Sequence, residues 1–319
     1  MNAPSMRQGS GDVMMMLEGI LLTIVTAATP LLFAAIGELV AERAGVLNLG
    51  VEGMMAVGAV CGFAAAFMTG NPLIGVLAAV IAGMLAASLF GIVALFFVAN
   101  QNATGVALTL FGLGLSGLIG DGFVGKPGIP MPKVSIPVLS DLPVVGRLVF
   151  GQDPFVYLAA ALTLATWWFL FRTRGGLVVR AVGDNAASAH ALGFPVLRTR
   201  FLAVLFGGAC AGLAGAYLSL VYTPQWAPAM TAGRGWIAIA LVVFASWLPG
   251  RLVLGALLFG GVSILQLHAQ AFGVGIPSQF LSMLPYVVTV VALVVISRNR
   301  TLLSVNTPAS LGRAFVPDN

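Results

Sequence analysis

The chain has 319 residues, of which 59% are hydrophobic and only 8% are charged, and its formal net charge is +5. Soluble domains carry about a quarter charged residues, so this composition excludes an ordinary water-soluble protein. Disorder is excluded as well, because apolar runs such as residues 72–98 are long and unbroken. These runs also lack the period-two alternation of barrel strands. The sequence therefore predicts an all-α fold, a polytopic transmembrane helical bundle.

Nine apolar segments are predicted to span the membrane. They are residues 17–36, 50–68, 73–98, 103–120, 155–171, 201–221, 236–248, 252–271 and 280–297. Residues 1–16 form a polar N-terminal segment before an uncleaved first helix, and residues 299–319 form a tail. Residues 37–50 could hold a tenth segment, short or re-entrant, and we favour ten spans for a reason given below. All spans belong to one membrane domain, residues 17–298.

The arginines orient this domain. Five of the fifteen basic residues lie in one short loop, residues 173–200 and its border: Arg172, Arg174, Arg180, Arg198 and Arg200. Basic loops stay in the cytoplasm, so this loop is predicted to be cytoplasmic, and the C-terminal tail with it. Residues 121–154 then form a long external loop, and residues 222–235 a shorter one. Because the charges serve orientation, the net charge does not indicate a nucleic-acid partner.

No catalytic or cofactor-binding constellation is visible. The two lysines, Lys126 and Lys133, do not lie in a phosphate-binding loop, so the chain is not expected to bind ATP by that route. His190 and His268 have no Cys or His partner at the spacing of a metal site. The sequence predicts a protein that is not itself an enzyme and binds no metal or cofactor.

Residues 177–194 form the most informative cytoplasmic stretch. Asp184 or Asn185 suits the N-cap of a short helix, and Gly193 suits its C-terminal cap. Pro195 prevents the helix from continuing. The result is a short, alanine-rich helix of about two turns. It could be a flat, rigid knob that fits a groove of another protein, or merely a connector, and the residues favour neither.

Three of the ten acidic residues lie in residues 38–53, at the membrane boundary: Glu38, Glu42 and Glu52. If residues 48–52 are helical, Asn48 and Glu52 share one face. An ionised glutamate within a span costs about 2.5–3.5 kcal/mol, which a partner or a water-filled cavity must offset. Asn48 and Glu52 could therefore line a translocation path. Capping and pairing with Arg43 is the simpler interpretation for Glu38 and Glu42, and both remain open for Glu52.

Two further groups could face such a path. A polar cluster separates the third and fourth spans: Asn100, Gln101, Asn102 and Thr104. A solvated turn explains this cluster more simply than re-entrant lining with Asn102. Three aromatic residues flank residues 222–235: Tyr222, Trp226 and Trp236. An interfacial aromatic belt is their default explanation, and a stacking platform for a ring-bearing substrate is the alternative.

Several stretches together resemble the permease subunits of ABC importers, in the branch that serves branched-chain amino acids, simple sugars and nucleosides. They are ERAGVLNLGVEG at 42–53, RAVGDN at 180–185 with Leu192 and Gly193, GRGWIAIA at 233–240, GALLFG at 255–260 and FLSMLPY at 280–286. The similarity extends over residues 38–297. The forms at 233–236 and 284–286 are most similar to the nucleoside-type permeases, while sugar and branched-chain amino acid permeases remain alternatives.

This resemblance implies a fold like that of the vitamin B12 type of importer, with six spans before the cytoplasmic loop where the chain shows five. That difference is why residues 37–50 are expected to hold a tenth span. It also implies that the loop docks on an ATPase through seven residues: Arg180, Gly183, Asp184, Asn185, Ala189, Leu192 and Gly193. The path is expected to include Asn48, Glu52, Asn102 and Trp236.

The implied partners are a separate ATPase subunit that uses ATP and Mg²⁺, a second permease (a related chain or a copy of this one) and a receptor lipoprotein. The implied location is a bacterial-type inner membrane. Two rival functions remain. An ion-coupled secondary transporter would need intramembrane acids, for which Glu52 gives thin support. A structural membrane protein would need uninterrupted spans, against which the glycine-broken stretches 45–53 and 112–122 argue.

Overall fold

The computed structural model describes residues 6–132, 151–271, 277–297 and 306–316, and every regular element within these ranges is helical. The helices are α1 (Met6–Arg43), α2 (Val51–Thr69), α3 (Pro72–Gly91), α4 (Gln101–Gly120), α6 (Pro154–Arg172), α7 (Arg174–Asp184), α8 (Ala186–Ala191), α9 (Val196–Tyr217), α10 (Arg234–Phe244), α11 (Pro249–Ala271) and α12 (Ser278–Ser297). Short π-helical turns extend α3 and α9, at Ile92–Phe96 and Leu218–Tyr222. Most of the expected external loop, residues 133–150, lies outside the described residues.

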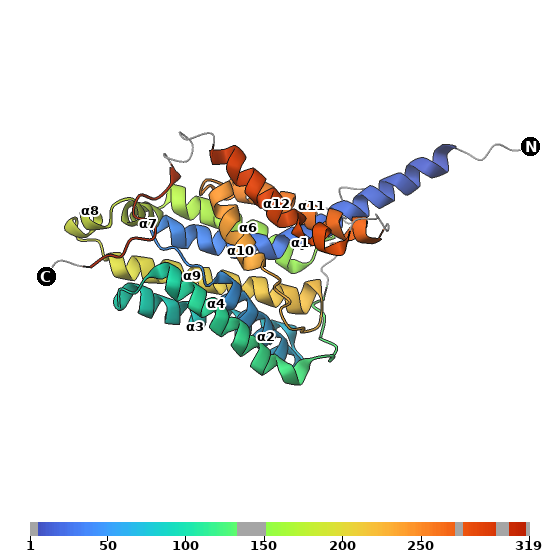
Figure 1. Ribbon diagram of the computed structural model, residues 1–319, viewed down its shortest axis with the longest axis horizontal. Coiled ribbons are helices and arrows are strands. Elements are labelled where there is room, and N and C mark those ends of the chain that lie inside the picture. The colour runs from blue at the N-terminus through green and yellow to red at the C-terminus, as the bar shows by residue number, and fades with distance from the viewer. Residues whose placement is uncertain (1–5, 133–150, 272–276, 298–305, 317–319) are drawn as a thin grey trace, which may run out of the picture.

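The predicted spans correspond to helices in chain order. Within the described residues, seven helices are long and apolar enough to cross a membrane, and α12 matches the last predicted span. The first helix is longer than predicted, because it begins at Met6 and continues to Arg43. Its N-terminal part projects beyond the bundle, as the blue helix in Figure 1 shows. The chain is therefore a multi-pass, all-α membrane protein.

The expected tenth span is absent. Residues 37–43 are the last two turns of α1, and residues 44–50 form a tight turn into α2. Gly45 takes a left-handed conformation (φ 86°) that ends α1, and its amide donates to the Glu42 carbonyl at 2.8 Å. Seven residues of turn cannot cross a bilayer whose hydrocarbon core is about 30 Å thick. The preference for ten spans was wrong for these residues.

The predicted span 236–248 also needs correction. Its helix, α10, has only 11 residues, which reach about 16 Å at the rise of an α-helix and cannot cross the bilayer alone. Its ends are set by backbone geometry. Gly233 precedes it in the left-handed region (φ 78°), and Ser246 and Trp247 follow it with positive φ angles of 50° and 55°. We call α10 a half-helix because it begins inside the bundle.

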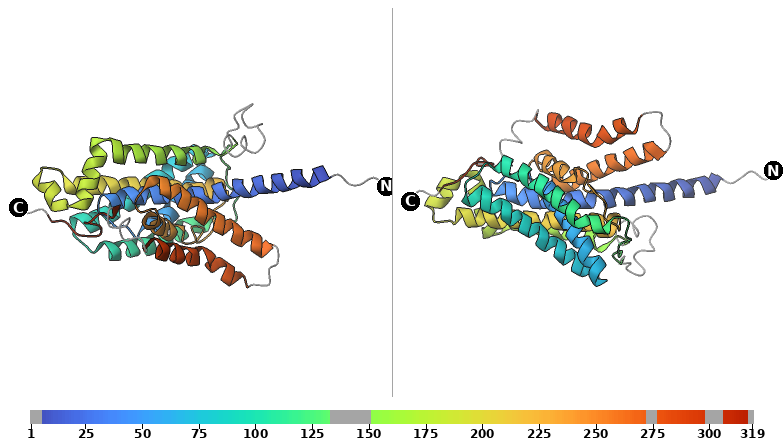
Figure 2. Two further views of the ribbon diagram at one scale, coloured as in Figure 1. Left: turned by 90° about the horizontal axis from the view of Figure 1, so that it is seen from above. Right: turned by 60° about the horizontal axis from the view of Figure 1, so that its bottom comes forward.

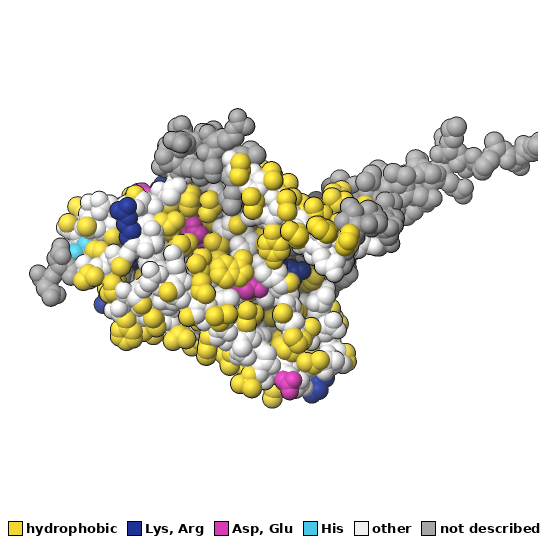
Figure 3. Space-filling model, viewed as in Figure 1, with side chains coloured by type: hydrophobic (Ala, Val, Ile, Leu, Met, Phe, Trp, Pro, Cys, Tyr) yellow, Lys and Arg dark blue, Asp and Glu magenta, His cyan; other side chains and the backbone are white. Residues whose placement is uncertain are grey.

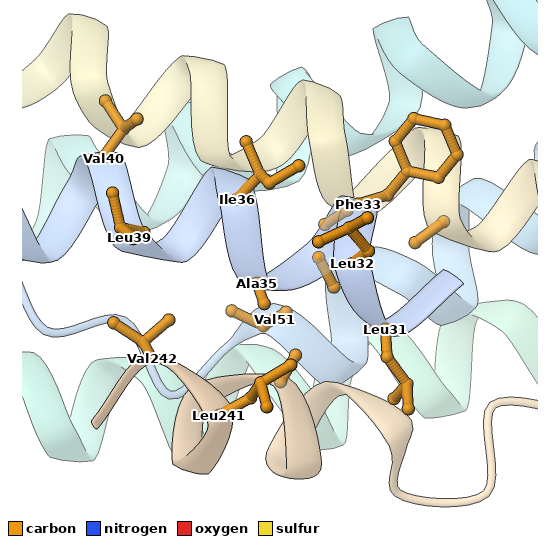
Figure 4. Packing of buried hydrophobic residues seen from close by; sticks show 14 of the residues in the cluster. Leu31, Leu32, Phe33, Ala35, Ile36, Leu39, Val40, Val51, Leu241 and Val242 are labelled. Carbon is orange, nitrogen blue, oxygen red and sulfur yellow. The ribbon is translucent and has the colours of Figure 1, made fainter. Parts of the chain in front are cut away.

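Helix α1 lies at the centre of the bundle. It packs against α9, α11, α10 and α6, and from Ala27 onward most of its side chains are buried. Figure 4 shows Leu31, Ala35 and Leu39 of α1 on the side that faces Leu241 and Val242 of α10. A helix that is apolar all round and buried must be a core element rather than a lipid-facing one.

Glycines bring α3 and α9 into close contact. A Cβ atom at Gly83 would lie 2.2 Å from the Gly208 carbonyl oxygen, and one at Gly212 would lie 2.2 Å from that of Ala79. Both distances are far below van der Waals contact. Lipid offers no hydrophobic drive between helices, so packing depends on small residues that let backbones approach.

Large apolar side chains cover the outside of the bundle. On α3 they form a stripe with a spacing of four residues: Leu73, Leu77, Ile81, Leu85 and Leu89, each at least 46% exposed. In the space-filling view, yellow apolar side chains cover much of the visible face and charged groups are sparse (Figure 3). This surface suits lipid, or another apolar subunit, and not water.

Candidate functional site

Helices α7 and α8 cap one end of the bundle, which we call the α7–α8 end (Figures 1 and 2). Thr173 caps α7 by accepting from the Gly176 amide at 3.1 Å, and Asn185 caps α8 by accepting from the Ser188 amide at 2.9 Å. Gly193 follows α8 with φ 84°, and its amide donates to the His190 carbonyl at 2.8 Å. The predicted short helix, its N-cap at Asn185 and its glycine stop are confirmed.

Three of the seven residues predicted to couple to an ATPase hold α7 and α8 on the bundle. Gly183 is buried against α1, where an added Cβ would lie 2.1 Å from the Arg43 carbonyl oxygen. Ala189 is 3% exposed in a small cluster with Val182 and Val196. The Arg180 guanidinium lies over the Phe171 ring, 5.1 Å from its centroid.

The other four predicted coupling residues lie on the surface: Asp184, Asn185, Leu192 and Gly193. Leu192 is 77% exposed, an unusual state for leucine at the polar end of a bundle. The structure therefore separates the predicted set into residues that fix α8 and residues that a partner could touch. Whether a partner touches them stays a prediction.

After α9, the chain turns back into the interior of the bundle. Residues 223–233, which we call the re-entrant segment, were expected in an external loop. Instead, Trp226 is 3% exposed and packs with Val60 and Phe63 of α2. Its ring fits beside α4 only because residue 120 is glycine, since a Cβ at Gly120 would lie 2.2 Å from it. Trp226 is thus a buried residue and not part of an interfacial belt.

Glu52 meets the end of this segment. Its carboxylate accepts from the Gly233 amide at 2.8 Å and from the Gly235 amide at 2.6 Å, and Glu52 itself is 3% exposed. The first amides of a helix have no partners within it, and the helix dipole favours a negative charge there. A carboxylate from the first turn of α2 therefore caps the half-helix α10 inside the bundle.

Asn48 is buried in the turn that precedes α2. Its side-chain oxygen accepts from the Gly50 amide at 2.9 Å, and its backbone amide donates to the Glu38 carboxylate at 3.1 Å. Because α2 begins only at Val51, residues 48–52 are not one helix, and the condition under which Asn48 and Glu52 would share a helix face is not met. An asparagine that bonds the amide two residues ahead favours a turn over a helix.

The four residues predicted to line a path come from one neighbourhood, but they differ in exposure. Leu47, beside Asn48, donates its amide to the Gln101 side chain at 2.9 Å, which places the start of α4 here. Asn102 is exposed, and Trp236 in the first turn of α10 is 37% exposed. Asn48 and Glu52 are buried and bonded to the protein. Their role in a path stays a prediction.

A second set of hydrogen bonds fixes the far end of α10. The Trp247 indole donates to the Glu42 carboxylate at 2.6 Å, and the Arg43 guanidinium donates to the Trp247 carbonyl at 2.9 and 3.2 Å. Glu42 and Arg43 thus have a structural role at the α7–α8 end, but the predicted pairing of Glu42 with Arg43 was wrong, because each of them bonds Trp247 instead.

Sequence reasoning missed a small cavity beside the re-entrant segment. It has a volume of 170 Å³ and lies between α2, α4 and residues 227–231, with Ala56, Ser116 and Thr231 among its lining. Ala229 and Ala232 have positive φ angles of 56° and 48°, a strained backbone for alanine. No periodic pattern in the sequence predicts such a segment. Within the described ranges, no three His, Cys, Asp or Glu side chains gather to hold a metal ion.

Residues 20–295 match the family model described as the permease component of branched-chain amino acid transport systems. The chain belongs to this family. A putative glucose ABC transporter permease protein of Haloferax volcanii is 45% identical over 81% of this chain and 80% of its own length. The guanosine permease protein NupQ of Bacillus subtilis and the nucleoside permease protein NupC of Lactococcus lactis are each 32% identical, over 88% of this chain and 93% of theirs. The chain is thus similar to ABC permeases for sugars and nucleosides, as the resemblance in its sequence led us to expect.

Proposed function

We propose that this chain is the membrane-spanning permease subunit of an ATP-driven importer that carries a sugar or a nucleoside. Its membership of the permease family over residues 20–295 carries the proposal. Relatives similar over four fifths or more of its length are named for glucose, guanosine and nucleoside transport. These solutes share a hydroxylated sugar ring, so a path for one of them needs polar groups that can replace water around hydroxyls.

In this proposal, the energy of ATP reaches the permease through α8. A separate ATPase subunit, which uses ATP and Mg²⁺, docks on the surface formed by Asn185, Leu192 and Gly193. Closure of two ATPase subunits pushes α8, and the buried contacts of Gly183 and Ala189 carry the push to α1. The permease then acts as a gate with two states whose populations ATP binding shifts. The α7–α8 end and the C-terminus face the cytoplasm of a bacterial-type inner membrane.

The half-helix α10 and the re-entrant segment form the gate region in this proposal. Irregular backbone at membrane depth is tolerated where it is buried in protein or lines a cavity. Transporter sites are often built from such broken helices. A receptor delivers solute at the end opposite to α8, and a second permease, a copy or a related chain, completes the path. Asn102 and Trp236 are the exposed candidates for contact with the solute.

Nucleoside and sugar are two candidates with different support. The motifs at 233–236 and 284–286 favour a nucleoside, for which the indole of Trp236 offers a stacking surface. The 45% identity to a putative glucose permease favours a sugar. A branched-chain amino acid is a third substrate class within the family. An ion-coupled secondary transporter is the rival mechanism.

The test is transport by the reconstituted complex. The tagged chain is purified from gently solubilised native membranes, its partners are identified by mass spectrometry, and the complex is placed in liposomes with ATP on the ATPase side. Radiolabelled guanosine, glucose and leucine are then offered with the receptor. ATP-dependent uptake of guanosine or glucose would support the proposal and choose between them. Uptake by the chain without an ATPase, driven by an ion gradient, would overturn it.

A further inference from the structure

The C-terminal segment, residues 306–316, crosses the α7–α8 end, and we call it the C-terminal strap. Pro308 is buried, and the Ser310 amide donates to the Gly183 carbonyl at 2.8 Å. The Ser310 hydroxyl donates to the Asp184 carbonyl at 3.2 Å. The Gly312 amide donates to the Gly45 carbonyl at 3.1 Å. The strap is therefore bonded both to the end of α7 and to the turn between α1 and α2.

Arg200 reinforces the same junction from α9. It is fully buried, its Nε donates to the Ala44 carbonyl at 3.1 Å, and its Nη1 donates to the Arg313 carbonyl at 2.9 Å. A buried guanidinium would be unfavourable without such acceptors. One side chain thus joins α9, the end of α1 and the strap.

The strap also completes the small core under α8. The Phe315 ring meets the His190 ring of α8 edge to face, with centroids 5.4 Å apart. Phe315 packs against the cluster of Val182, Ala186, Ala189 and Val196. A six-residue helix of alanines, a serine and a histidine has too little helix-forming energy to stand alone. Packing must therefore hold α8 in place, and the strap supplies part of it.

We propose that the C-terminal strap is part of the surface on which the ATPase subunit docks, and that it positions α8 for that contact. The inference rests on the proposed function, because it assumes that α8 meets an ATPase. Val316, which follows Phe315, is 63% exposed, and Leu192 after α8 is 77% exposed. Exposed aliphatic side chains at the polar end of a bundle fit an apolar groove of a protein partner. The strap then links this surface to the turn that leads into Glu52.

Three variants of the full complex test the proposal. Phe315→Ala removes the ring that packs on α8, and Phe315→Leu keeps an apolar side chain there. Phe111→Ala is the matched control, because it also removes a phenylalanine ring, but one that is 55% exposed on α4, outside the strap and α8. We expect Phe315→Ala to weaken ATPase association about tenfold, equivalent to about 1.4 kcal/mol, and to lower solute transported per ATP, because the half-buried ring no longer packs on α8. Phe315→Leu should keep most of both, and Phe111→Ala should change neither.

A photo-crosslinking amino acid at position 316 gives a second measurement that does not depend on folding of a truncated chain. We expect it to crosslink to the ATPase subunit in the assembled complex. Absence of that crosslink, or a Phe315→Ala complex with lower thermal stability but unchanged association and coupling, would overturn the strap's role. Failure of the proposed function is distinguishable, because then the wild-type complex itself would show no ATP-dependent uptake.

Discussion

At the scale of single residues, Glu52 shows how one carboxylate is used inside the bundle. The sequence left open whether it lines a path or caps a helix. In the structure both oxygens accept backbone amides at the start of α10, so its charge is already committed to the protein. A path could still pass close by, because Trp236 beside it is partly exposed.

Replacing Glu52 should destabilise the fold at the start of α10. Glu52→Ala leaves the buried amide of Gly235 and the half-buried amide of Gly233 without an acceptor, and an unsatisfied buried amide costs about 1–3 kcal/mol. Glu52→Gln keeps one acceptor oxygen, and its effect should be about half as large. Thermal unfolding of the detergent-solubilised variants measures this. Equal stability of Glu52→Ala and the wild type would contradict the capping role.

Gly193 is the second residue whose role is local. Its φ of 84° suits glycine, and an added Cβ would meet nothing within 4 Å. Gly193→Val therefore clashes with no neighbour, but it strains the backbone after α8 by about 1–2 kcal/mol. We expect normal insertion and more ATP hydrolysed per solute transported. Gly250→Val is the control, because Gly250 also has open space around it and its φ is not positive. Equal coupling in both variants would refute the assignment of α8.

At the scale of elements, the break before α10 distinguishes this bundle from a simple set of crossing helices. Residues 236–248 form one apolar run, and their hydropathy predicted a full span. The helix stops after 11 residues because Trp247 turns away to bond Glu42 and Arg43. Those partners come from α1, more than 200 residues earlier in the chain, so no local pattern could reveal them.

The packing of α3 on α9 gives a prediction for a pair of elements. Gly212→Ala places a Cβ 2.2 Å from the Ala79 carbonyl oxygen, so the helices must separate. We expect a lower thermal midpoint and poorer recovery from membranes, with overpacking costing about 1–3 kcal/mol. Gly117→Ala on α4 is the matched control, since its Cβ meets no atom within 4 Å. A control that loses as much stability would show that contact at this interface is not the cause.

At the scale of the whole molecule, the α7–α8 end gathers the ends of α1 and α10, the starts of α9 and α11, and the C-terminal strap. The re-entrant segment and α10 together make one pass, because α9 starts at this end and Trp247 returns to it. With the seven long helices and α12, the described residues make an odd number of crossings. Figure 2 shows α1 leaving the bundle at the opposite end.

The two termini should therefore lie on opposite sides of the membrane. Single cysteines at residue 8 and residue 313, in a variant without Cys61 and Cys210, can be labelled in intact cells with an impermeant maleimide. We expect labelling at residue 8 only, because the strap lies at the end proposed to face the cytoplasm. Labelling of both positions or of neither would require an even number of passes.

The sequence by itself determined the membrane class, the order of the spans, the position of the α8 knob and the family. These depend on local composition and on caps such as Asn185 and Gly193, which act within a few residues. Only the tertiary structure decided that Glu52 caps α10, that Trp226 is buried, and that the strap packs under α8. Each of these depends on partners far apart in the chain, which meet only when lipid-exposed helices pack and bury their polar groups together.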